Sequence, residues 1–195
     1  NHVSPEMALA YGADAVLMMC TIGGADYKAL QKMAEDIDAF HKLHIPVIAE
    51  VMCDDYMKTV SYDIQLNGAR IAAELGADVV KGFYTEKFEN VVGCCPVPFI
   101  MAGGAVDKNI VDTARDALNC GAKGLAVGRN IFQSENPAAT IAKVAEVFGA
   151  QGSNAWWDLS VEELMPEGYA CKCGCKSFRR ESNTLDGWFD SGSSH

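Results

Sequence analysis

Residues 76–84 read GADVVKGFY, and this stretch decides the fold of the chain. The apolar run after Gly76 predicts a short buried strand, and the glycine itself suits the end of the preceding helix. The strand ends on Lys81, where the hydrophobic segment gives way to a loop. A lysine in that position is either a solvated strand end or a reactive amine, and the rest of the sequence has to distinguish the two.

The same pattern occurs twice more along the chain. Residues 11–16 read YGADAV and residues 120–125 read CGAKGL, so an amphipathic segment again ends at a glycine and an apolar run follows. Two further apolar runs follow prolines, at residues 45–49 and 97–101. The sequence therefore predicts five strands, which start near residues 13, 45, 77, 97 and 122.

Helical patterns lie between these strands. One opens at Ser4-Pro5, and the others cover residues 26–43, 62–75, 107–119 and 136–148. Strands that alternate with helices indicate a parallel sheet covered by helices. The residue pattern fits a doubly wound sheet and a part of a (β/α)₈ barrel equally well.

The composition is that of a soluble globular protein. The chain has 195 residues, 49% of them hydrophobic, and a formal net charge of −10. This charge argues against a nucleic-acid surface, which needs clustered Lys and Arg. No apolar run approaches the ~20 residues that span a bilayer, and no signal peptide is recognisable, so we expect a cytoplasmic protein without a membrane partner.

Three strand ends carry residues that suit a ligand site. Lys81 ends the third strand, Gly103-Gly104 ends the fourth and Gly128-Arg129 ends the fifth. In parallel α/β proteins ligands bind at the carboxyl ends of the strands, where glycine loops and an arginine can hold a phosphate. The alternative is that the glycines only form turns.

Lys81 also has two readings. If its amine is held in an apolar pocket, it loses its charge more readily and can attack a carbonyl to form a Schiff base. A phosphate site two strands away would then hold the far end of a phosphorylated keto substrate.

Three segments carry a family resemblance. Residues 69–81 read ARIAAELGADVVK, residues 95–104 read CPVPFIMAGG and residues 127–133 read VGRNIFQ. They resemble class I aldolases of the archaeal fructose-bisphosphate aldolase type, a broad family that includes deoxyribose-phosphate-type aldolases and the thiolase that degrades phosphorylated autoinducer-2.

The resemblance covers about residues 1–149 and implies a TIM (β/α)₈ barrel, of which this chain holds about strands 4–8. It also implies an enzyme without a cofactor, a carbon–carbon lyase acting on a phosphorylated ketose or similar keto-phosphate. Lys81 would form the Schiff base, and the substrate phosphate would be bound by Gly103, Gly104, Gly128 and Arg129.

The sequence departs from this family at the proton donor. Met52 stands where the fructose-bisphosphate enzymes have a Tyr, which leaves Glu50, Tyr56 and Tyr84 as candidates. Tyr84 alternatively only packs its ring beside Lys81. The missing Tyr shifts the prediction toward the thiolase, an acyl-transfer enzyme, and a non-covalent phosphosugar-binding barrel is a further alternative.

The family's first three strands are not in this sequence, and neither is the acidic residue that the first strand carries. An open five-stranded sheet exposes an edge and half of a barrel core. We therefore expect the chain by itself to be inactive or weakly active and prone to associate. A complete barrel is expected to form a homo-oligomer.

The composition changes near residue 150, which predicts a first domain over 1–149 and a second segment over 150–195. Residues 164–168 read LMPEG and residues 188–192 read WFDSG. With these motifs, residues 152–195 resemble a part of isoleucyl-tRNA synthetase that contains a knuckle-like turn. The turn here has Cys171, Cys173 and Cys175, whereas zinc knuckles use C-x₂-C spacing, so a zinc site would be incomplete. An inactive chimera of two fused reading frames is the alternative explanation for this join.

Overall fold

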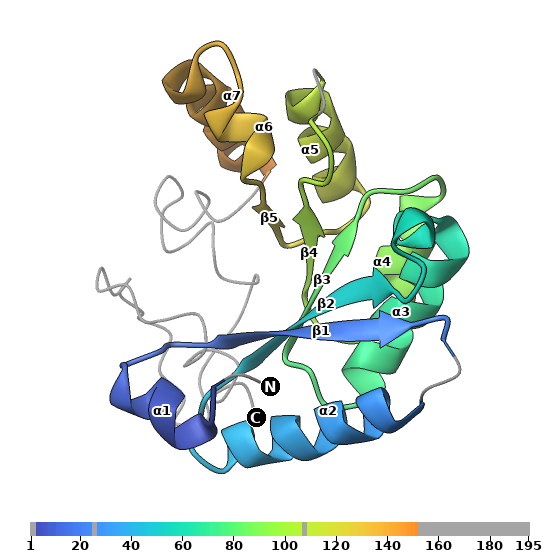
Figure 1. The fold of residues 1–195 in the computed structure, drawn as a ribbon. Coiled ribbons are helices and arrows are strands. Elements are labelled where there is room, and N and C mark those ends of the chain that lie inside the picture. Colours follow the sequence, from blue (N-terminus) through green and yellow to red (C-terminus); the bar gives the residue numbers. More distant parts are fainter. Residues whose placement is uncertain (1–2, 25–26, 107–108, 152–195) are drawn as a thin grey trace, which may run out of the picture. The chain divides into compact units, whose positions relative to one another are not determined.

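The fold is built on a five-stranded parallel sheet whose strands follow one another in chain order, β1-β2-β3-β4-β5 (Figure 1). The computed structural model describes residues 3–24, 27–106 and 109–151. The strands are β1 Val16–Ile22, β2 Val47–Cys53, β3 Val79–Phe83, β4 Phe99–Ala102 and β5 Gly124–Ala126.

The helices connect and cover the strands. They are α1 Pro5–Ala10, α2 Tyr27–His41, the 3₁₀ turn η1 Tyr56–Lys58, α3 Tyr62–Glu74, α4 Phe88–Cys94, α5 Ile110–Asn119, α6 Arg129–Phe132 and α7 Pro137–Gln151. No described helix is long and apolar enough to cross a membrane.

The five predicted strands are confirmed, and each begins two or three residues after its expected start. Sequential order distinguishes the two folds that the residue pattern had left open. A doubly wound sheet reverses its strand order at a switch point, whereas consecutive βα units of a barrel place each strand beside the last. The observed order is that of a barrel segment.

Each repeated glycine lies at the joint between a helix and the next strand. Gly12, Gly76 and Gly121 have φ values of +68°, +104° and +101°. These left-handed conformations end α1, α3 and α5 and turn the chain back into a strand, which glycine does without a side-chain clash. The recurring sequence phrase therefore marks the same turn three times.

The hydrophobic core lies between the sheet and helices α2, α3 and α4. Along β2 every second residue is buried, beginning with Val47 and ending with Cys53. Helix α2 buries Met33, Ile37 and Phe40 at helical spacing. Helix α4 was not expected from the sequence, because seven residues with only Phe88 and Val91 buried give too short a repeat to read as helical.

The opposite face of the sheet carries the alternate residues. On β1 this face is open, since Leu17 and Met19 are 50% and 63% exposed. On β2 and β3 it holds the charged residues described below.

The chain divides into two units, residues 1–147 and residues 148–195. The domain boundary expected near residue 150 stays a prediction, because residues 152–195 lie outside the described residues.

Candidate active site on the inner face of the sheet

Glu50 and Lys81 form an ion pair between two neighbouring strands. They are register partners on β2 and β3, so strand alternation places both side chains on the same face of the sheet. Glu50 Oε1 lies 3.0 Å from Lys81 Nζ. The two side chains are only 14% and 17% exposed, so the pair is largely removed from solvent. The expected strand end at Lys81 is wrong, because β3 continues to Phe83 and Lys81 is its middle residue; Lys81 is also not freely solvated.

The residues level with this pair are apolar or small. The register continues from Glu50 to Met19 on one side and from Lys81 to Ile100 and Gly124 on the other. A carboxylate beside an amine in such surroundings can accept the proton that the amine must lose before it attacks a carbonyl.

Met52, which matches the position of the family's Tyr, lies on the same face as Glu50. It is two residues nearer the carboxyl end of β2, and Thr21 is its register partner on β1. A thioether can neither donate nor accept a proton at this position. Among the candidates for proton transfer, only Glu50 contacts Lys81 in the described structure.

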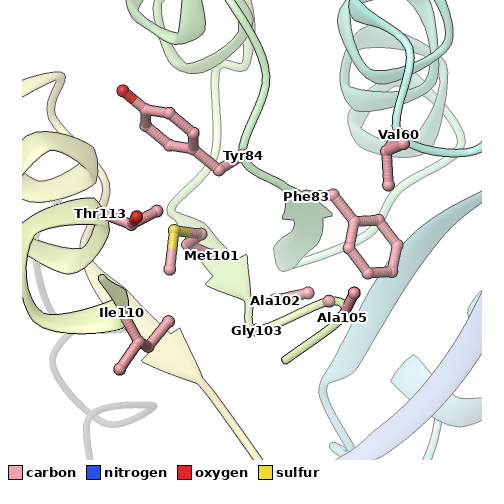
Figure 2. Close-up of a pocket in the computed structure, with 10 residues that line it drawn as sticks. Val60, Phe83, Tyr84, Met101, Ala102, Gly103, Ala105, Ile110 and Thr113 are labelled. Atoms are coloured by element: carbon pink, nitrogen blue, oxygen red, sulfur yellow. The ribbon is translucent and has the colours of Figure 1, made fainter. Parts of the chain in front are cut away.

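The structure does not bring Tyr84 together with Lys81. Tyr84 continues the alternation of Gly82, whose side faces the helices, and its ring centroid is 4.9 Å from that of Phe88. Figure 2 shows the Phe83 and Tyr84 rings pointing to opposite sides. Burial, and secondly the Asp116 carboxylate, raise the pKa of Tyr84 and keep its phenol protonated. Its placement fits the packing alternative, but against Phe88 rather than beside Lys81.

The remaining candidate, Tyr56, begins the 3₁₀ turn η1 after β2 and is 65% exposed.

The two glycine loops expected to bind phosphate lie side by side. The Gly103 N–H donates to Ala126 O at 3.1 Å, which joins the end of β4 to the end of β5. Gly104 has a φ of +62°, a conformation that favours glycine. Gly128 precedes the four-residue helix α6. Arg129 is exposed and makes no ion pair within the described part of the chain.

Sequence reasoning gave Asn130 no role, and the structure assigns it one. It is 3% exposed, and its Nδ2 donates to Gly103 O at 2.7 Å and to Ala105 O at 3.1 Å. This amide therefore fastens the first glycine loop to the start of α6. The only sequence signal was an amide residue directly after Gly128-Arg129.

A cavity of about 220 Å³ opens beside the first glycine loop (Figure 2). Its lining includes Phe83, Met101 and residues 103–105, with Ile110 and Thr113 from α5. Lys81 and Glu50 are not among its lining residues.

The described residues contain no group of three or more His, Cys, Asp or Glu side chains that could hold a metal ion. Cys171, Cys173 and Cys175 lie outside the described residues, so the weak zinc prediction remains a prediction. The described cysteines are all free thiols, and burial raises the pKa of Cys20 to about 11.

Comparison with known proteins gives a family match over most of the chain. A family model described as DeoC/LacD family aldolase matches residues 2–134. The chain is 35% identical over 137 residues to 2-amino-3,7-dideoxy-D-threo-hept-6-ulosonate synthase 1 of Archaeoglobus fulgidus, covering 69% of this chain and 52% of that protein.

A second relative is the 3-hydroxy-5-phosphonooxypentane-2,4-dione thiolase of Escherichia coli K12. It is 33% identical over 149 residues, which cover 74% of this chain and 51% of that protein. Among solved structures, an archaeal fructose 1,6-bisphosphate aldolase superposes with a TM-score of 0.69 at 29% identity. The match covers 75% of this chain and 62% of that one.

The chain thus spans about half the length of the curated relatives it matches. The match to an aldolase structure confirms the predicted α/β fold and its likeness to barrel aldolases. Residues 152–195 lie beyond the family match and outside the described residues, so the synthetase resemblance expected there stays a prediction.

Proposed function

The chain belongs to the DeoC/LacD aldolase family, and we propose that it carries the Schiff-base half of a class I aldolase site for a phosphorylated ketose or similar keto-phosphate. The observation that carries this proposal is the Lys81–Glu50 pair, 3.0 Å apart and largely removed from water. A solvated lysine would have no need of such a partner, and burying two charges together is costly unless they are paired.

In the proposed reaction Lys81 Nζ attacks the carbonyl carbon of the substrate. Glu50 carries two protons in turn from the nitrogen to the carbonyl oxygen: the first gives the hydroxyl of a carbinolamine, and the second lets that hydroxyl leave as water. The resulting protonated imine accepts the electron pair of the bond between the α and β carbons as the β-hydroxyl loses its proton, which releases an aldehyde and leaves an enamine on Lys81. Protonation of the enamine carbon and addition of water then release the ketone and return the free amine. Glu50 is favoured for proton transfer because it alone among the named candidates contacts the amine.

The substrate phosphate is proposed to lie at the paired glycine loops. Backbone N–H groups near Gly103, Gly104 and Gly128 can approach an oxyanion closely, and Arg129 has a guanidinium that makes no ion pair in the described residues. Asn130 supports this proposal because it holds the first loop in place from beneath.

Met52 favours acyl transfer to a thiol as a second candidate reaction. Met52 stands where a Tyr would donate a proton during aldol cleavage, and the Escherichia coli relative is a thiolase. The same imine could activate a diketone phosphate, from which an external thiol removes an acyl group. Aldol cleavage and acyl transfer are distinguished by whether turnover of the unreduced substrate, without borohydride, requires the thiol.

Borohydride trapping tests the shared first step. It reduces an imine to a stable secondary amine, so the chain is incubated with dihydroxyacetone phosphate and borohydride, and its peptides are weighed by mass spectrometry. We expect an adduct on Lys81 that is lost in Lys81→Met and retained in Lys87→Met, since Lys87 is an exposed lysine after the strand. Glu50→Gln is expected to slow trapping by about 10²-fold.

Two outcomes contradict the proposal. Trapping on other lysines that persists in Lys81→Met would mean that Lys81 is no more reactive toward the keto group than an ordinary surface lysine. No adduct on any lysine would favour the non-covalent phosphosugar-binding barrel instead.

The remaining expectations stay with this proposal. We expect a cytoplasmic enzyme that forms a homo-oligomer if its barrel is complete. Light scattering on the complete barrel would show a mass that is a multiple of the mass of one chain, to which these 195 residues contribute 20.9 kDa. The synthetase-like segment is tested by elemental analysis for zinc in the wild-type chain and in Cys171→Ser.

A further inference from the structure

Gln65 is a fully buried side-chain amide on the face of the sheet opposite Lys81. It lies on α3 and has 0% exposure. Its Oε1 accepts a hydrogen bond from the Phe83 N–H at 2.9 Å. Its Nε2 donates to Thr59 O at 2.6 Å and, over a longer 3.5 Å, to Val51 O. Burying an amide this deeply costs free energy unless hydrogen bonds satisfy it, so these bonds hold the Gln65 side chain in one position.

These bonds join the two strands that carry the ion pair. Val51 directly follows Glu50 on β2, and Phe83 is the second residue after Lys81 on β3. The described register between β2 and β3 ends at the Glu50–Lys81 pair. The Gln65 amide therefore bridges the strands beyond their last register pair, one residue further along β2 and two residues further along β3.

The loop after β2 is tied into the same network. Thr59 is 2% exposed, and its Oγ1 accepts a hydrogen bond from the Cys53 N–H at 3.0 Å. Through Thr59 O, Gln65 thus also fixes the segment between β2 and α3.

Gly82 leaves the space that the amide occupies. A Cβ at this position would overlap Gln65 Oε1 and would lie 2.5 Å from Phe99 Cζ. The Gln65 amide can bridge β2 and β3, an arrangement that we call the clamp, only because residue 82 is a glycine. Because Gln65 approaches from the helix side, it can influence Lys81 only through the backbone of β3.

We propose that Gln65 is a positioning residue that holds the Glu50 and Lys81 side chains in register at the point where β2 and β3 separate. The proposal rests on the proposed function for its kinetic readout, since the pair has to be the imine-forming site. The structural part of the proposal, that Gln65 holds the end of β3, depends only on the hydrogen bonds of Gln65 described above. A small change in reacting geometry is enough to matter, because displacements near 1 Å can slow a reaction by about 10²-fold.

The structural half is tested by amide hydrogen exchange. In the wild-type chain the Phe83 N–H is expected to be protected like that of Val80, which donates to Pro98 O within the sheet. In Gln65→Met, which keeps the side-chain length without the amide, Phe83 is expected to exchange at least about tenfold faster while Val80 is unchanged. A Phe83 amide that exchanges freely in the wild-type chain would overturn the clamp without any variant.

The kinetic half is tested by the rate of borohydride trapping on Lys81 at varied dihydroxyacetone phosphate concentration and pH. Gln65→Met is expected to lower the maximal rate by about tenfold or more, to shift the pH profile, and to change the half-saturating concentration less than twofold. Ile37→Val is the matched control, since Ile37 is a buried residue of α2 away from the pair, and its rate and pH profile should equal the wild type.

The outcomes separate the two proposals. If the wild-type chain forms no adduct on Lys81, the proposed function fails, whatever the exchange data show. If it forms the adduct and Gln65→Met traps at the wild-type rate with the wild-type pH profile, the positioning role is overturned while the proposed function stands.

Discussion

Replacing Gly82 by alanine should destabilise the protein strongly, although it adds a single methyl group. The new Cβ would overlap Gln65 Oε1 and lie 2.5 Å from Phe99 Cζ, and neither neighbour can move easily. Phe99 is 1% exposed and packs edge-on against Phe88, with ring centroids 5.5 Å apart. Gln65 is held by its hydrogen bonds to Phe83 and Thr59.

The expected cost has two parts. Overpacking a core by one methyl group typically costs about 1–3 kcal/mol. If the Gln65 amide is displaced, the buried Phe83 N–H loses its acceptor, which costs about 1–3 kcal/mol more. Gly82→Ala should therefore lower the free energy of unfolding by about 2–6 kcal/mol, and the melting temperature by roughly 5–20 °C.

Urea unfolding followed by circular dichroism measures this change, and Gly93→Ala is its control. Gly93 lies in α4, and no atom lies within 4 Å of the place its Cβ would take. Alanine is the better helix former, so Gly93→Ala should leave stability unchanged or raise it by up to about 1 kcal/mol. A loss below about 0.5 kcal/mol in Gly82→Ala would refute the reasoning, since the strand would then have room for a side chain.

Two further predictions concern a thiol and a carboxylate. Burial raises the pKa of Cys20 to about 11, so at pH 8 its thiolate fraction is about 10²-fold below that of an ordinary thiol, and iodoacetamide should label it more slowly than Cys120. The Cys20 thiol ionises at lower pH in the unfolded chain than in the folded one, so the stabilisation from its raised pKa is complete below about pH 9 and is lost as pH rises toward 11. Cys20→Ala should remove this part of the pH dependence of the unfolding free energy. Equal slopes of that free energy against pH in the two proteins would contradict the prediction. Asp78 Oδ2 accepts a hydrogen bond from the Val47 N–H at 2.7 Å and lies 2.8 Å from His41 Nε2, so Asp78→Ala should cost about 1–3 kcal/mol in urea unfolding and Asp78→Asn less. Equal losses in the two Asp78 variants would show that the hydrogen bond to the strand is not the cause.

Much of the fold was readable because it is encoded locally. Apolar runs after glycines and prolines predicted all five strands, and the left-handed φ values at Gly12, Gly76 and Gly121 explain why the motif repeats. Helix α4 was missed because a seven-residue helix with two buried side chains carries no measurable period. The choice between a doubly wound sheet and a barrel segment depends on strand order, which residue patterns do not contain.

The candidate site was predictable only in part for the same reason. The glycine loops could be named because each follows the end of a strand, and parallel strands end at one edge of the sheet. Lys81 was named as a strand end, although β3 continues two residues further to Phe83. Tyr84 was named for its nearness in sequence, but alternation along β3 directs it to the helices, where it packs against Phe88. Gln65 and Asn130 went unassigned, since a polar residue within an amphipathic pattern looks solvent-exposed until its partners are known.

The stretch at residues 76–84 shows which features the sequence determined and which the tertiary structure decided. By itself the sequence determined a helix end and a buried strand that carries a lysine, because those features follow from glycine conformation and from an apolar run over a few residues; the tertiary structure showed that the strand continues past Lys81 to Phe83. Only the tertiary structure decided that Glu50, 31 residues earlier, lies level with Lys81. Strand register is set by packing between segments distant in sequence, and a shift of one residue would turn the two side chains to opposite faces of the sheet.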